Sequence, residues 1–166
     1  MTIKKRLEAH DFTLAAELSL PAGLAWDAAK AQALELRPRA DLIVIADNPW
    51  GMPGFSPLLL AASLAAEWPE VVMEVNLRDR NRVALESDLK SAAAAGVKNF
   101  LVSTGAFFGE QGRREAKSVH DLDPVQLVRL LGTEVPGLGI TLSVVEQLLE
   151  MTPHFFSKAR QAGAGQ

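Results

Sequence analysis

Residues 71–106 read VVMEVNLRDRNRVALESDLKSAAAAGVKNFLVSTGA and contain one complete unit of the pattern on which the fold prediction depends. The first apolar run, Val71–Leu77, lacks the polar alternation of a half-exposed strand and is typical of a buried parallel strand. The next segment places apolar side chains on one face at helical spacing, namely Leu85, Leu89, Ala92 and Ala93. A second apolar run, Phe100–Ser103, predicts another strand. The stretch therefore predicts a strand, a helix and a second strand parallel to the first.

Both ends of that helix carry recognisable signals. Asp79 or Asn81 can cap its N-terminus, because short side-chain oxygens accept hydrogen bonds from the free amides of the first turn. Gly96 is placed to end the helix in a left-handed conformation.

The alternation of strands and helices extends along the chain, with no hairpin signal. We expect further strands at residues 12–18 and 41–46, and helices at 25–36, 56–68 and 124–131. Residues 139–145 could form a fifth strand or begin a helix. We expect a single domain over residues 1–166, with an N-terminal arm at 1–11 and a tail at 150–166.

Alternation of this kind predicts an α/β fold with a parallel sheet and right-handed crossovers. Two architectures fit it: a partial TIM-type barrel of parallel βα units, or a small open doubly wound sheet. Periodicity does not separate them. The length of 166 residues favours the open sheet, because a full barrel takes about 250 residues.

Composition argues against several classes of protein. The net charge of −3 and the pI near 5.6 argue against a nucleic-acid binder, which needs a basic face. No cysteine is present, so disulfides and thiolate metal sites are excluded. The three histidines lack metal-ligand spacing, and we expect no metal site. No apolar run approaches the roughly 20 residues that span a bilayer, and the first residues lack a signal-peptide pattern, so we expect a cytoplasmic protein without a membrane partner.

Polar residues follow each predicted strand: Glu17, Asp47-Asn48, Arg78-Asp79 and Ser103-Thr104-Gly105. Parallel sheets and barrels bind ligands at the carboxyl ends of their strands. Glu17 is a candidate general acid, because a carboxyl among Ala15, Ala16, Leu18 and Leu20 would be poorly solvated and would tend to keep its proton.

The segments LRDRNRVALESDL and AAGVKNFLVSTG resemble the flavin-dependent methylenetetrahydrofolate reductases, with their CRDRNR helix and the LTGD turn after the fourth barrel strand. TLAAELSLP, ADNPWG and KSVHDLDPVQL resemble further motifs of that family. The resemblance implies a barrel flavoprotein of one-carbon metabolism that transfers hydride through FAD, with NADH or NADPH as electron donor and a folate or pterin as substrate.

The resemblance also implies roles for individual residues. Glu17 takes the position of the proton donor that helps open the methylene bridge of the folate. The residues expected to bind the cofactor are Asp47, Asn48, Glu74, Arg78, Thr104, Gly105, Ala106, His120 and Asp121.

This chain departs from the family at two of those positions. Ala106 stands where the family has an aspartate beside the flavin, and Glu74 stands where it has a histidine. The resemblance covers about residues 12–131, roughly half of a reductase barrel. We therefore expect a homo-oligomer or a partner subunit to complete the sheet. The alternative is a non-catalytic relative that acts as a binding or assembly subunit of a larger redox or one-carbon complex.

Overall fold

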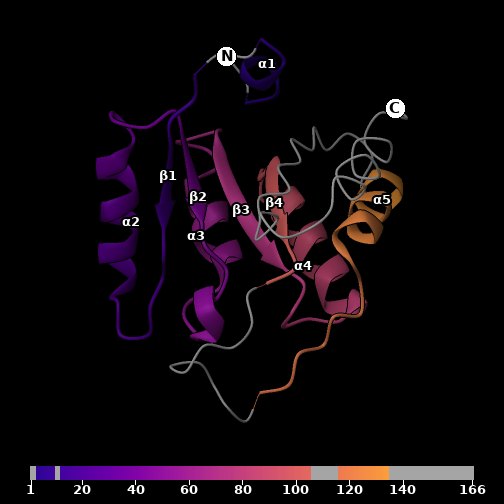
Figure 1. Cartoon of the computed structure of the whole chain (residues 1–166). Helices are drawn as coiled ribbons and strands as arrows, with labels where there is room; N and C mark the ends of the chain where they lie inside the picture. The colour runs from indigo at the N-terminus through magenta and orange to yellow at the C-terminus, as the bar shows by residue number, and fades with distance from the viewer. Residues whose placement is uncertain (1–2, 10–11, 106–115, 135–166) are drawn as a thin grey trace.

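The structure is a computed structural model that describes residues 3–9, 12–105 and 116–134. At its centre lies a four-stranded sheet whose order, β1-β2-β3-β4, follows the sequence (Figure 1). The strands are Ala15–Leu18 (β1), Leu42–Ile45 (β2), Val71–Asn76 (β3) and Asn99–Ser103 (β4). Every neighbouring pair is parallel, so the predicted α/β fold with a parallel sheet is confirmed. The described sheet is open, with β1 and β4 at its edges.

The helices follow the predicted alternation. They are α1 (Ile3–Glu8), α2 (Trp26–Leu36), α3 (Pro57–Leu64), α4 (Arg82–Ala94) and α5 (Pro124–Glu134), with a short 3-10 turn, η1, at Pro49–Gly51. β1 is shorter than expected, and α3 ends before the predicted Trp68. The possible strand at 139–145 lies outside the described residues. No helix in the described ranges is long and apolar enough to cross a membrane.

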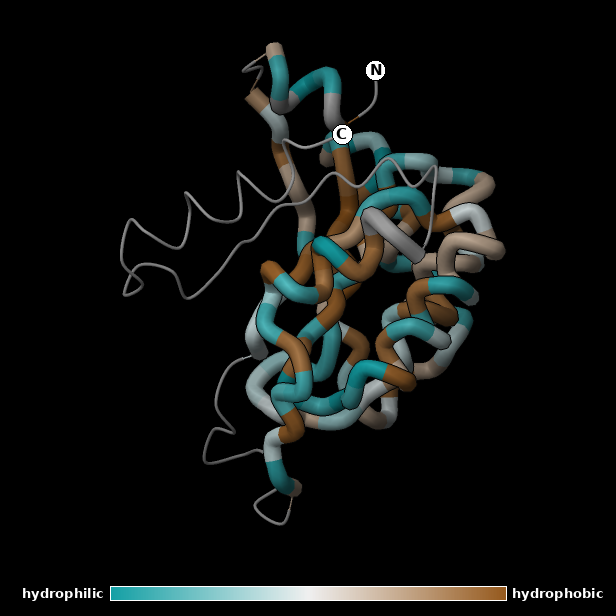
Figure 2. Tube along the Cα trace, turned by 90° about the vertical axis from the view of Figure 1, so that its right-hand side faces the viewer, coloured by the Kyte–Doolittle hydropathy of each residue, from teal (hydrophilic) through white to brown (hydrophobic). Residues whose placement is uncertain are grey.

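The two faces of the sheet differ in what covers them. One face, here called the helix face, packs against α2, α3, α4 and α5 and forms the main core. Its strand residues are Leu18, Ile43, Ile45, Val71, Met73, Val75, Phe100 and Val102. Figure 2 shows the hydrophobic strands running through the centre of the molecule. The continuous apolar runs of the sequence are explained by this burial.

The opposite face, here called the α1 face, meets only α1 among the described helices. Ile3 of α1 packs on Leu42 and Val72, near the start of β2 and β3, and Val44 and Leu101 lie half-buried beside them. Strand register places Glu17, Glu74 and Ser103 on the same face. The α1 face is thus apolar near α1 and polar toward the carboxyl ends of the strands.

Both predicted ends of α4 are confirmed. Asn81, not Asp79, caps α4, with its Oδ1 accepting from Ala84 N at 3.0 Å. Gly96 follows α4 with a φ of +90°. Asp123 and Gln126 form a reciprocal capping box at the start of α5. Ser56 occupies the N-cap of α3, but its side chain makes no capping bond.

Core packing gives the first prediction. Phe100 is fully buried between the sheet and its helices, so Phe100→Ala should lower the free energy of unfolding by about 3–5 kcal/mol through lost contacts and a residual cavity. Val83, which is 75% exposed on α4, is the control: Val83→Ala should change stability by at most about 0.5 kcal/mol. Urea titration of both variants measures the difference, and equal losses would contradict the described core.

Candidate functional site

A buried carboxylate joins the ends of β2 and β3. Asp47 follows β2, and its side chain is 0% exposed. Its Oδ2 accepts from Arg80 Nη1 at 2.6 Å and from Asn76 N at 2.9 Å, while its Oδ1 accepts from Arg80 Nη2 at 2.8 Å. Its backbone carbonyl accepts from Asn76 Nδ2 at 2.7 Å. This bidentate pair satisfies a charge that would otherwise be costly to bury.

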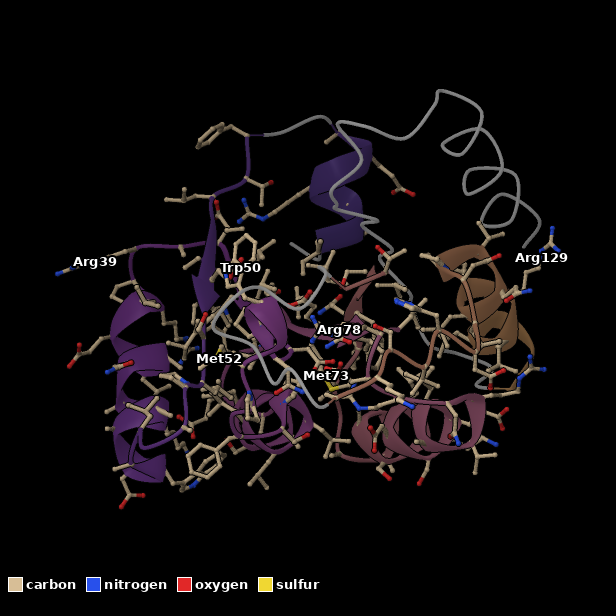
Figure 3. The ribbon with its side chains drawn as sticks, turned by 60° about the horizontal axis from the view of Figure 1, so that its bottom comes forward. Arg39, Trp50, Met52, Met73, Arg78 and Arg129 are labelled. Carbon is tan, nitrogen blue, oxygen red and sulfur yellow. The ribbon has the colours of Figure 1, made fainter. Side chains whose placement is uncertain are left out.

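A second ion pair lies beside the first. Arg78, which is 1% exposed, donates from Nε to Asp79 Oδ1 at 2.6 Å and from Nη2 to Asp79 Oδ2 at 2.8 Å. Its Nη2 also donates to the carbonyl of Asn48 at 3.0 Å. Arg78 lies near the centre of the carboxyl edge of the sheet in Figure 3. The pair therefore ties the loop after β2 to the loop after β3.

The two pairs shift the titration of their members in the expected directions. Burial would raise the pKa of Asp79, but the hydrogen bonds and charge of Arg78 outweigh it and lower that pKa. Burial would lower the pKa of Arg80, but the hydrogen bonds and charge of Asp47 outweigh it and raise that pKa. Both shifts favour the charged forms of Asp79 and Arg80.

The loop after β2 is held in a strained conformation. Asn48 and Trp50 have left-handed φ values of 46° and 58°, which non-glycine residues adopt at a cost of about 1–3 kcal/mol each. Asn48 Oδ1 accepts from Gly54 N at 3.2 Å, and Asn48 Nδ2 donates to Asp79 Oδ2 at 3.3 Å. These contacts hold the loop, and Trp50 stays 65% exposed.

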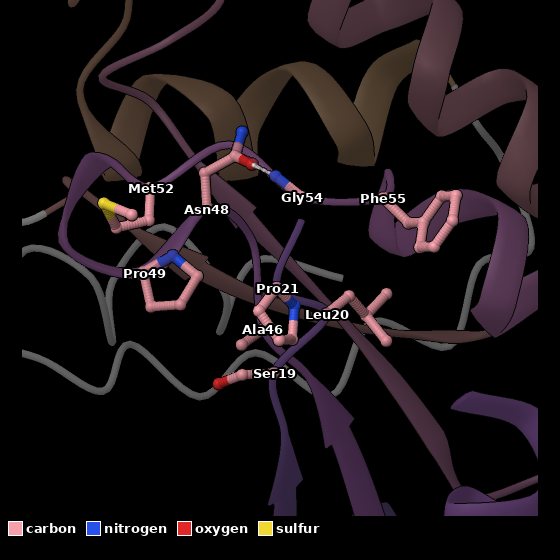
Figure 4. Close-up of a pocket in the computed structure, with 9 residues that line it drawn as sticks. All are labelled: Ser19, Leu20, Pro21, Ala46, Asn48, Pro49, Met52, Gly54 and Phe55. Carbon is pink, nitrogen blue, oxygen red and sulfur yellow. Dashed lines mark hydrogen bonds between the residues drawn. The ribbon is translucent and has the colours of Figure 1, made fainter. Parts of the chain in front are cut away.

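The same loop borders a shallow hollow at the ends of β1 and β2 (Figure 4). Its lining residues are Ser19, Leu20, Pro21, Ala46, Asn48, Pro49, Met52, Gly54 and Phe55. It encloses about 290 Å³, part of which is open solvent. Because that volume includes open solvent, the hollow is smaller than an ordinary ligand pocket and does not by itself define a binding site.

Glu74 occupies the middle of the α1 face. Its Oε2 accepts from Asp47 N at 2.9 Å, and its Oε1 accepts from Ser103 Oγ at 2.9 Å. Burial raises the pKa of this half-buried carboxyl, and the charges of Asp47 and Glu17 raise it further, against the two hydrogen bonds, which lower it. The pKa of Glu74 is therefore raised overall.

The expected burial of Glu17 is wrong. Glu17 is exposed, because β1 is an edge strand and its residue 17 points to the α1 face. The apolar neighbours that suggested burial, Ala16 and Leu18, point to the opposite face. Glu17 is therefore not shielded from water in the described sheet.

The structure brings most of the predicted cofactor residues to one edge. Asp47, Asn48, Glu74 and Arg78 are linked by the hydrogen bonds above. Gly105 is half-buried with a φ of +81°, and a Cβ there would lie 2.8 Å from Arg78 Cβ, so this close approach requires glycine. Thr104 precedes it and is half-buried. Because the polar atoms of Asp47 and Arg78 bind within the chain, we assign neither side chain to ligand contact.

The remaining predicted residues lie nearby or outside the described ranges. His120 is exposed with a left-handed φ of 44°. Asp121 Oδ2 accepts from Arg82 N at 2.8 Å and so holds the start of α4. The segment is anchored by Val119 N, which donates to the carbonyl of Arg78 at 2.7 Å. Ala106 lies outside the described residues.

Two residues of the site were not singled out from the sequence, Asn76 and Arg80. The available signal was the position of Asp47 directly after an apolar strand, since a carboxylate buried there needs a cation and hydrogen-bond donors. The sequence does not show which residue supplies the cation, because 33 positions separate Arg80 from Asp47. Within the described residues, no group of three histidine or acidic side chains could hold a metal ion.

Comparison with known proteins identifies no family for this chain. No protein-family model matches the sequence, and no curated protein matches it.

Titration of Asp79 gives the second prediction. An acid whose pKa is lowered by folding contributes stability above its unfolded pKa of about 3.9, and this contribution is lost as the pH falls through the folded value. Wild type should therefore be more stable than Asp79→Asn at pH 7, and the gap should shrink below about pH 4. Urea unfolding from pH 2.5 to pH 7, with Asp27→Asn on the exposed start of α2 as control, measures this. A gap independent of pH would contradict the assignment.

Proposed function

We propose that this chain forms part of a (βα) barrel flavoprotein that resembles methylenetetrahydrofolate reductases and reduces a folate or pterin. Parallel strands in sequence order, with helices α2 to α5 on one face, are the arrangement of consecutive units in such a barrel. On this proposal the α1 face lines the barrel interior. Further strands, from a second copy, a partner subunit or a longer chain, would complete it.

One observation carries the proposal. Glu17, Glu74 and Ser103 come from three strands and share the α1 face toward the carboxyl ends, where parallel folds bind their ligands. Beside them, Val44 and Leu101 give a half-buried apolar strip. A flat ring with polar edges fits a surface of this composition.

The side chains on the α1 face suit the ring of a flavin better than its phosphates. The apolar strip can pack on the ring system, and Ser103 and Glu74 can hydrogen-bond to its polar edge. The guanidinium groups of Arg78 and Arg80 are bound to Asp79 and Asp47, so they contribute no contact with a diphosphate. A bound flavin supplies hydride chemistry, with NADH or NADPH as its proposed electron donor, and we assign Glu17 to the substrate side of the site.

A non-catalytic binding or assembly subunit is the second candidate. Ala106 favours it, because alanine has no polar group to replace the aspartate that the resemblance places beside the flavin. The two candidates differ in whether flavin is retained.

Flavin retention gives the third prediction. The purified chain, or its complex if it purifies with a partner, should keep visible flavin absorption through gel filtration after incubation with FAD. Val44→Arg, which places a charge on the α1 face, should lower the retained flavin at least tenfold. Leu59→Arg should not, because Leu59 is 52% exposed on α3, away from that face.

Each contrary result has a defined meaning. Retention that Val44→Arg leaves unchanged would place flavin elsewhere on the protein. No retention by the wild-type chain would overturn the flavoprotein proposal and favour the non-catalytic subunit.

A further inference from the structure

We infer that Glu74 is the carboxyl group that holds the transferable proton of this site. The inference rests on the proposed function for the group that receives the proton and for the place of the ligand on the α1 face. It differs from the sequence-based expectation, which gave that role to Glu17.

Position is the first argument. Glu74 lies on a central strand and is half-buried, whereas Glu17 lies on an edge strand and is exposed. A proton donor works best when its carboxyl is shielded from water yet faces the ligand. Glu74 meets both conditions, because the α1 face is the side on which a ligand would lie.

The partners of Glu74 are the second argument. Both are neutral donors, the backbone N–H of Asp47 and the hydroxyl of Ser103. Among the described residues none forms an ion pair with Glu74, because the neighbouring guanidinium groups of Arg78 and Arg80 pair with Asp79 and Asp47 instead. Glu74 is therefore a shielded carboxyl without a compensating cation.

The nearby negative charges act in the same direction. The charged groups around it are Glu17 on β1, Asp47 after β2 with its partner Arg80, and the Arg78–Asp79 pair after β3. Burial raises the pKa of Glu74 most, and the charges of Asp47 and Glu17 add to the increase. An acid with a raised pKa is the better proton donor near neutral pH.

The proton balance of the step is simple. The O–H bond of the Glu74 carboxyl breaks as an N–H bond forms with the lone pair of a ligand nitrogen. The electrons of the O–H bond stay on the carboxylate, so nothing is oxidised or reduced. The carboxylate that remains keeps its hydrogen bonds from Asp47 N and Ser103 Oγ, which favour the charged form. Water at the exposed end of the site can return a proton before the next cycle.

Carboxyl titration of the ligand-free protein tests the inference directly. In protein carrying ¹³C-labelled glutamate, the resonance that disappears in Glu74→Gln identifies Glu74. It should titrate above the ordinary glutamate value of about 4.3. Ser103→Ala should move that midpoint further up, because it removes a hydrogen bond to the charged form, and Glu17→Gln should move it down, because it removes a nearby negative charge.

Turnover of a folate by the flavin-loaded protein provides the second readout. Glu74→Gln should lower kcat at least about 100-fold, the usual contribution of a general acid, whereas Glu35→Gln, exposed on α2, should not. A Glu74 midpoint at or below the ordinary value, or unchanged turnover in Glu74→Gln, would overturn the inference. A wild-type chain without turnover would remove the proposed function, while the titration would still decide whether Glu74 holds the proton.

Discussion

The carboxylate of Asp47 is the constraint on which this edge of the molecule depends. It is completely buried at the end of β2, and it receives two hydrogen bonds from Arg80 and one from the backbone of Asn76. A buried carboxylate is tolerated only when such partners are present. The polar ends of β2 and β3 must therefore stay together, and the loops that follow them start from fixed positions.

The candidate site follows from that constraint. The N–H of Asp47 donates to Glu74, and Glu74 accepts in turn from Ser103, so hydrogen bonds link the segment after β2 to β3 and β4. Because Asp47 and Asp79 already pair with the two arginines, Glu74 is left with neutral partners only. The same hydrogen bonds hold the half-buried carboxyl of Glu74 on the α1 face, where burial and the charges of Asp47 and Glu17 raise its pKa.

The local features of the fold could be predicted from the sequence, whereas the site could be predicted only in outline. Apolar runs and helical spacing predict the strand and helix order, and the Asn81 cap and the Gly96 turn depend on neighbouring residues alone. The predicted burial of Glu17 is wrong because residues adjacent in a strand point to opposite faces, so its apolar neighbours do not surround it. The Asp47–Arg80 pair connects different strand ends, and a single sequence gives no pairing information over that distance.

A double-mutant cycle between Asp47 and Arg80 tests whether this buried pair stabilises the ends of β2 and β3. Urea unfolding of Asp47→Asn, Arg80→Gln and the double variant gives the coupling free energy of the pair. We expect a favourable coupling of more than about 1 kcal/mol, as for groups in one hydrogen-bonded network. Stability changes that add within about 0.5 kcal/mol would contradict it, since independent residues behave in that way.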